Sequence, residues 1–147
     1  MDLILWFKDC SYKNKNIVGG KCASLGELNH LARMLNFDIA DGFAITTTLY
    51  DDFIQRNNIM DTIEHTLNTI DTTNLDELEE SSAKLRDMVT AGSFTDEQVA
   101  IITKHYDDLS ELFHTSDLEV AVRSSAIAED LPNASFAGQQ DTYLNVK

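Results

Sequence analysis

Two short stretches of the chain contain the residue types that bind phosphate. The first is Gly19-Gly20-Lys21, which directly precedes a run of residues with helical spacing. Glycines ahead of a helix let the backbone approach a ligand, and the helix N-terminus offers free N–H groups and a positive dipole end. A lysine adds a mobile positive charge. The pattern G-x-x-x-x-G-K-[ST] is absent, and an ordinary turn with a surface lysine has the same sequence, so this stretch alone decides nothing.

The second stretch lies near the C-terminus, where an apolar run ends on Arg123 and two serines. An arginine at a strand end can hold an anion with its planar guanidinium group. The alternative for Arg123 is a structural ion pair with Glu129 or Asp130. Further along, Gly138 could bring its backbone close to a ligand and Thr142 could offer a hydroxyl group. An ordinary hairpin turn would explain those two residues equally well.

Other chemistries find little support in the sequence. The four histidines, at positions 30, 65, 105 and 114, are scattered over expected helices and have no acid or serine partner by spacing. Solvated or core histidines explain them, and no catalytic residue or metal ligand is nominated. Cys10 and Cys22 show neither metal spacing nor a disulfide-rich pattern, so they are interpreted as reduced thiols of a cytosolic protein.

Composition bounds the class of protein. The length of 147 residues fits a single domain, and 43% hydrophobic residues can build a core. A net charge of −14, from 25 acidic against 11 basic residues, argues against a nucleic-acid binder but leaves room for a nucleotide in a locally basic pocket. The apolar runs are too short for a bilayer and no charged leader opens the chain, so we expect no membrane partner and a cytoplasmic location.

The pattern of apolar residues predicts an α+β domain. It indicates a polar loop at residues 11–16 and a helical layer at residues 47–114. The first expected helix is Cys22–Leu35. The expected strands are Leu3–Phe7, Phe43–Thr46, Leu118–Arg123 and Thr142–Val146.

Several details of the helices are also predicted. Leu25, Leu28, Leu31, Ala32 and Leu35 recur at three- and four-residue intervals and form one apolar face of the first helix.

Within the helical layer, Thr47 or Thr48 is the expected cap of a helix that carries Leu49, Phe53 and Ile54. The pattern stays helical from Ile59 to Ala91, and Gly92 ends it. Its expected inward residues are Leu75, Leu78, Leu85 and Met88. Thr95 and Gln98 match a capping box that opens a further helix.

Three blocks of the sequence resemble a known family. They read VGGKCASLGEL (18–28), DGFAITTTLYDDFI (41–54) and VAVRSSAIAEDLPNASFAGQQDTYLNV (120–146). They resemble the N-terminal ATP-binding region of the pyruvate, phosphate dikinase family, in its phosphoenolpyruvate synthase and rifampicin phosphotransferase branches. The blocks occur in the order of the family, and the resemblance covers essentially the whole chain.

The resemblance implies an ATP-grasp nucleotide-binding domain, with a mixed sheet and a helical layer, of which residues 1–147 form the N-terminal half. In such enzymes ATP transfers its β-phosphoryl group to a histidine on a separate domain, and AMP and phosphate are released. The histidine then passes the group to pyruvate or to the antibiotic. By this resemblance Lys21 and Arg123 match the phosphate-binding cations, and Gly138 and Thr142 match positions that line the ATP site.

The resemblance also sets limits. The family usually has V-P-x-G-F before its second strand, where this chain has Phe37-Asp-Ile-Ala-Asp-Gly-Phe43. The Mg²⁺ ligands of the family lie in a later part of the domain, so ATP is the expected ligand and Mg²⁺ ligands are expected outside this chain. The chain is therefore expected to be an ATP-binding portion that is inactive alone and completed by a missing C-terminal half or a full-length paralogue. The alternative is a truncated, non-catalytic nucleotide-binding or regulatory module.

Overall fold

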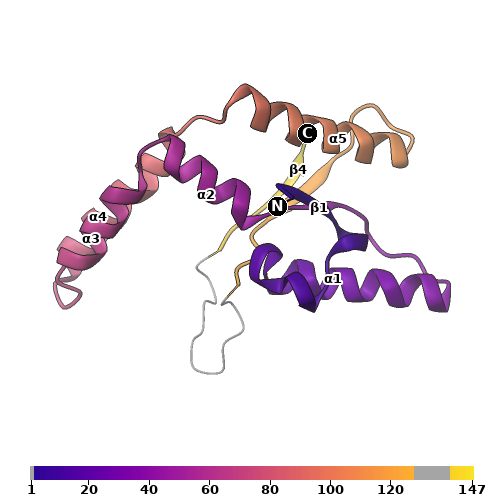
Figure 1. Ribbon diagram of the computed structural model, residues 1–147, viewed down its shortest axis with the longest axis horizontal. Coiled ribbons are helices and arrows are strands. Elements are labelled where there is room, and N and C mark those ends of the chain that lie inside the picture. Colours follow the sequence, from indigo (N-terminus) through magenta and orange to yellow (C-terminus); the bar gives the residue numbers. More distant parts are fainter. Residues whose placement is uncertain (1, 128–139) are drawn as a thin grey trace.

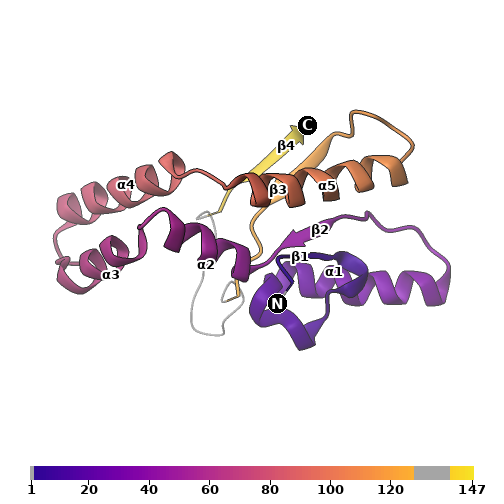
Figure 2. The same ribbon diagram turned by 45° about the horizontal axis from the view of Figure 1, so that its top comes forward.

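The computed structural model describes residues 2–127 and 140–147, and within them the chain has the predicted α+β class (Figure 1). The elements in chain order are β1 (Ile4–Trp6), two 3-10 turns η1 (Phe7–Asp9) and η2 (Tyr12–Asn14), α1 (Lys15–Leu35), β2 (Phe43–Ile45), α2 (Thr47–Arg56), α3 (Met60–Thr69), α4 (Leu75–Ala91), α5 (Asp96–Leu112), β3 (Val120–Arg123) and β4 (Thr142–Val146). Helices α2 to α5 show that residues 47–114 are mainly helical, as predicted, although α3 and α4 project away from the sheets instead of forming a layer on them (Figures 1 and 2). None of the helices in these residues is long and apolar enough to cross a membrane.

The described strands form two separate antiparallel pairs. β1 pairs with β2, with Leu5 opposite Ala44, and β3 pairs with β4, with Arg123 opposite Thr142. The expected mixed sheet is thus not formed among the described residues, because neither pair contains a parallel neighbour. The strands have three to five residues each, and β3 and β4 are largely exposed, so no further strand covers them within this part of the chain.

The elements are arranged openly around the two small sheets (Figures 1 and 2). Helix α1 lies beside the β1–β2 pair, while α5 runs on the other side, next to the β3–β4 hairpin. Helix α2 leads away from the sheets to α3 and α4, which lie side by side and form a projecting arm. In both views the arm lies away from α1. The arm and the sheet region are therefore held by different contacts.

Two small apolar clusters hold these parts together. The first packs Cys10, Val18, Ala23 and Ala44 between the β1–β2 pair and the beginning of α1.

The second cluster packs Phe53, Ile54 and Ile59 against Met88 and Val89, which fixes α2 to the arm. Met88 is therefore inward, as predicted. Leu75 and Leu78 were expected to point inward as well, but they are 75% and 37% exposed, so that prediction is wrong for both.

The buried face of α1 differs from the predicted one. It consists of small and polar residues, namely Ala23, Gly26, Asn29 and Ala32. The predicted leucine face is wrong for Leu28, Leu31 and Leu35, which are 43%, 46% and 69% exposed, whereas Leu25 is partly buried and Ala32 is buried. The reason is close backbone packing: a Cβ on Gly26 would lie 1.9 Å from the carbonyl oxygen of Cys10. Only a face of small residues allows the preceding segment to lie so near the helix.

Local hydrogen bonds account for two further corrections. The predicted loop at residues 11–16 is instead a 3-10 turn followed directly by α1. The N–H of Ser11 donates to Asn14 Oδ1 at 2.8 Å, and the N–H of Lys13 donates to Ser11 Oγ, so the side chains cap the turn from both sides. The N-cap of α2 is Thr46, one residue before the predicted caps, and it forms no side-chain cap hydrogen bond.

The continuous helix predicted from Ile59 to Ala91 is broken into α3 and α4. In the turn between them the carboxylate of Asp71 accepts hydrogen bonds from the N–H and the hydroxyl of Thr73, at 2.9 and 2.7 Å. Asn74 then caps α4 by accepting from the N–H of Glu77 at 3.3 Å. These short polar side chains compete with helical hydrogen bonding, which explains the break. Gly92 ends α4 as predicted, with extended backbone.

Candidate functional site

Gly19 interrupts α1 and sets the geometry of the candidate site. Its backbone has φ 78° and ψ 172°, a conformation that side chains rarely adopt, and regular helix follows it. A Cβ at this position would lie 1.6 Å from the carbonyl oxygen of Ser125. The glycine is therefore needed both for the bend and for the close approach of the segment after β3. The predicted helix start at the glycine pair corresponds to this break within α1.

Two backbone N–H groups beyond the bend bind the segment that follows β3. The N–H of Gly20 donates to the carbonyl oxygen of Ala126 at 3.1 Å, and the N–H of Cys22 donates to Ser125 Oγ at 3.0 Å. The two phosphate-binding stretches predicted from sequence thus meet in space. The expectation of free N–H groups at this helix start is wrong for Gly20 and Cys22, because the chain itself uses both.

Lys21 reaches the same junction through its side chain. Its Nζ donates to Gln140 Oε1 at 3.2 Å, and the hydroxyl of Ser124 donates to the same oxygen. Ser124 directly follows Arg123, and Gln140 lies two residues before Thr142. The structure therefore connects Lys21 to the end of the β3–β4 hairpin. The sequence interpretation did not nominate Gln140, because an amide beside a glycine has no distinctive spacing.

Arg123 and Thr142 are direct partners in the β3–β4 pair. Residues directly opposite each other in an antiparallel pair project from the same face, so these side chains are neighbours. Both are exposed. Gly138 lies outside the described residues, as do Glu129 and Asp130, so the role of Gly138 and the alternative ion pair of Arg123 stay predictions. The structure pairs Arg123 with Thr142 and links Lys21 to Gln140, two residues before Thr142; that these residues form an ATP site stays a prediction.

The thiol of Cys10 is unreactive. Cys10 is fully buried, and its thiol donates to the carbonyl oxygen of Trp6 at 3.3 Å. Burial raises its pKa to about 12, with smaller contributions from Cys22 and Asp9 nearby. A thiol with so high a pKa is a poor nucleophile at neutral pH. Cys10 therefore serves packing rather than catalysis.

The histidine with the most aromatic contacts is also structural. His105 on α5 packs against Trp6 and Phe43, with ring centroids 5.5 and 5.6 Å apart, and its Nδ1 lies 2.7 Å from the carbonyl oxygen of Ile101. It joins α5 to the β1–β2 pair.

The described residues contain no cluster of side chains that would hold a metal ion by itself. No group of three or more histidines, cysteines, aspartates or glutamates in residues 2–127 and 140–147 is placed to hold a metal. Magnesium prefers carboxylate and water oxygens in octahedral geometry. No chemical step is therefore derived through the metal from these residues.

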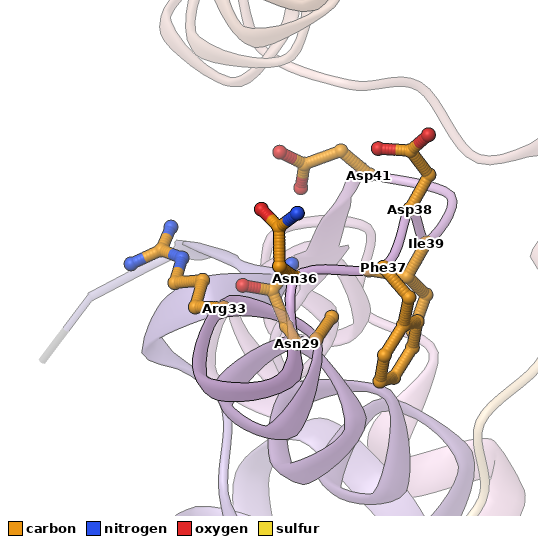
Figure 3. Close-up of a pocket in the computed structure, with 8 residues that line it drawn as sticks. Asn29, Arg33, Asn36, Phe37, Asp38, Ile39 and Asp41 are labelled. Carbon is orange, nitrogen blue, oxygen red and sulfur yellow. The ribbon is translucent and has the colours of Figure 1, made fainter.

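A separate hollow of about 390 Å³ lies at the other end of α1 (Figure 3). Asn36, Asp38 and Asp41 line it, and Arg33 is the cation among its lining residues. The C-terminus of a helix carries partial negative charge, and the two carboxylates add to it, so the hollow disfavours phosphate. Asn29 Oδ1 is buried there without a hydrogen-bond partner among the described residues. The acidic lining makes this hollow a poor candidate for binding phosphate.

Comparison with known proteins identifies a nucleotide-binding family. The family described as "Pyruvate phosphate dikinase, AMP/ATP-binding domain" matches residues 15–147, a region that contains all four predicted site residues.

The curated relatives include phosphoenolpyruvate synthases of bacteria and archaea. The phosphoenolpyruvate synthase of Helicobacter pylori is 42% identical over 147 residues, which are 100% of this chain and 18% of that protein. That of Aquifex aeolicus is 41% identical over 144 residues, or 98% of this chain and 17% of the relative. The probable phosphoenolpyruvate synthase of Methanocaldococcus jannaschii is 40% identical over 147 residues, or 100% and 12%. The chain thus spans less than a fifth of the length of these relatives. By its sequence from Lys15 onward, the chain belongs to the pyruvate phosphate dikinase AMP/ATP-binding domain family.

Proposed function

We propose that the chain supplies part of the ATP site of a phosphoenolpyruvate synthase-like phosphotransferase, in which the terminal phosphates of ATP lie between Lys21 and Arg123. The observation that supports the proposal is the contact of Lys21 with Gln140, which lies two residues before Thr142, the strand partner of Arg123. Membership of an AMP/ATP-binding family supports ATP as the ligand. Relatives named phosphoenolpyruvate synthase favour that branch over rifampicin phosphotransferase.

The two cations have complementary roles in this proposal. The guanidinium of Arg123 can bind two phosphate oxygens at once, whereas the ammonium of Lys21 acts as a mobile point charge. Positioned charges of this kind stabilise the negative charge that is redistributed as a phosphoryl group leaves. Thr142 would add a hydroxyl donor from the same face as Arg123. Gly138 is proposed to bring its own backbone close to the nucleotide.

The complete reaction would need groups that the described residues do not supply. We propose that the phospho-accepting histidine, the Mg²⁺ ligands and the acceptor site belong to further polypeptide, as the greater length of the relatives supports. The chain alone would then bind ATP without turning it over to AMP and phosphate. We propose a cytoplasmic location, since free thiols such as those of Cys10 and Cys22 are usual in a reducing environment.

Calorimetric titration with MgATP and with adenosine tests the ATP site. Losing a hydrogen-bonded charge costs about 1.5–3 kcal/mol, so Arg123→Ala and Lys21→Met should each weaken MgATP binding about tenfold to a hundredfold. Adenosine lacks phosphates, and its weaker binding should not change. Arg56→Ala is the matched control, because Arg56 pairs with Asp52 on the surface of α2. Absent MgATP binding by the wild type, or equal losses in the control, would refute the proposed site.

A second measurement tests the proposal that the chain is one portion of an enzyme and is inactive alone. The purified chain is incubated with MgATP, and release of AMP and phosphate is followed over time. We expect none above the background of the Arg123→Ala variant. Sustained turnover by the wild-type chain would show that this chain suffices for catalysis by itself.

A further inference from the structure

Gln140 occupies the point where the two walls of the candidate site meet. Its Oε1 accepts from Lys21 Nζ on α1 at 3.2 Å and from the hydroxyl of Ser124, which follows β3. We propose that Gln140 is a positioning residue that holds the Lys21 ammonium beside Arg123, ready for phosphate. The inference rests on the proposed function and assigns a role to a residue outside the predicted site.

The hydrogen-bonding capacity of the groups fixes the orientation of the amide. The ammonium of Lys21 only donates hydrogen bonds, so Gln140 must present its oxygen rather than its NH₂ group. The hydroxyl of Ser124 fills the second lone-pair position of that oxygen. With both positions occupied, rotation of the amide by half a turn would place two sets of donors against each other. Gln140 therefore has one favoured orientation, and Lys21 is held with it.

The neutrality of Gln140 matters as much as its position. A carboxylate here would also hold the ammonium, but it would neutralise the charge of Lys21 and repel the phosphates. An amide can hold the lysine without adding a negative charge of its own. Lysine loses up to about 2 kcal/mol of side-chain conformational freedom when it is ordered. Ordering Lys21 before ATP binds removes part of that cost from the binding step.

Three variants separate position from charge. Ordering one long side chain costs about 0.5–1.5 kcal/mol, so Gln140→Ala should weaken MgATP binding about twofold to tenfold. Gln140→Glu should weaken it further, because it adds repulsion. Asn145→Asp is the control, since it adds the same charge on the exposed strand β4, and it should leave the affinity unchanged. Adenosine binding should be the same in all three.

A double-mutant cycle shows whether Gln140 acts through Lys21. In a Lys21→Met background, Gln140→Ala should cause no further loss of MgATP affinity, because the group that it positions is gone. A residue that merely supports the fold would cause the same loss in both backgrounds. Equal losses would therefore overturn the positioning role.

A measurement without nucleotide keeps the inference separate from the proposed function. Acetylation of lysines by a small reagent is followed by mass spectrometry on the nucleotide-free chain. Gln140→Ala should raise the labelling rate of Lys21 severalfold while that of Lys15, at the start of α1, stays unchanged. An unchanged Lys21 rate would overturn the positioning role. Absence of MgATP binding by the wild type would overturn only the proposed function.

Discussion

Replacing Gly19 by alanine gives the most direct test of the junction between α1 and the segment after β3. The residue has φ 78° and ψ 172°, where a Cβ costs about 1–3 kcal/mol in backbone strain. The added Cβ would lie 1.6 Å from the Ser125 carbonyl oxygen, whereas ordinary contacts begin at 3.4 Å. The two nearest atoms, the carbonyl oxygen and carbon of Ser125, belong to the backbone and cannot yield by rotating a side chain. The two segments must therefore separate.

Separation removes the hydrogen bonds that hold the junction. The bonds from the N–H of Gly20 to Ala126 and from the N–H of Cys22 to Ser125 contribute about 0.5–1.5 kcal/mol each. Added to the strain, this gives a loss of about 2–6 kcal/mol in the free energy of unfolding, a large part of the 5–15 kcal/mol typical of a domain. Because Lys21 moves with the helix start, MgATP affinity should fall in the variants that still fold.

Urea unfolding followed by far-UV circular dichroism measures the loss, and MgATP titration measures its effect on the site. Gly42→Ala is the matched control: its Cβ would meet the ring of Phe7 at 2.7 Å, and an aromatic side chain can shift where a backbone carbonyl cannot. We expect the control to lose much less stability. If Gly19→Ala stayed within about 1 kcal/mol of the wild type and bound MgATP equally well, the junction could not have the geometry described.

Three further predictions concern other parts of the chain. Burial raises the pKa of Cys10 from 9.0 to about 12, so the unfolded chain loses the thiol proton at lower pH than the folded chain does. The stability that the buried neutral thiol contributes is therefore present below pH 9 and should fall between pH 9 and 12. Cys10→Ala should flatten this part of a plot of urea midpoint against pH. Thr95→Ala should cost about 0.5–2 kcal/mol in thermal unfolding by removing the N-cap of α5, whereas Thr103→Ala on the exposed face of the same helix should cost little, and equal effects would contradict the capping role. The isolated chain should self-associate in light scattering through the exposed leucines of α1, and Leu31→Gln with Leu35→Gln should reduce its apparent mass; a monodisperse wild-type monomer would count against this.

Features that depend on neighbouring residues could be predicted from the sequence. The capping box is one: Thr95 and Gln98 bind each other's backbone N–H groups, and both partners lie within one turn. The bounds of β4 agree with the predicted Thr142–Val146, since β-branched and aromatic residues favour an extended chain. The helical character of residues 47–114 was predictable for the same reason, as their apolar spacing persists over many turns.

Features that depend on distant contacts could not be predicted in this way. Periodicity indicated a leucine face on α1, but the close approach of Cys10 to Gly26 decides which face is buried. Periodicity also predicted one continuous helix across residues 70–74. There the side chains of Asp71 and Asn74 accept hydrogen bonds from nearby residues, and the helix is broken.

In the proposed ATP site, too, some features were predictable from the sequence and others were not. Its cations were predicted at Lys21 and Arg123, largely through the family resemblance. The contact of Lys21 with Gln140 was not predicted, because it joins residues 119 positions apart.

The charge of the chain explains why the site must be assembled from two distant stretches. At −14 the chain repels ATP at long range, but such repulsion is largely screened beyond about 8 Å at physiological ionic strength. Binding then depends on cations at contact distance. A single surface lysine would contribute little, because an exposed charge interacts weakly in water. Many of the acids lie on α3 and α4, in the arm that projects away from the start of α1 (Figure 2). The fold thus keeps these seven of the 25 acidic residues away from the start of α1, where the hydrogen bonds of Ser125 and Gln140 hold the two stretches together.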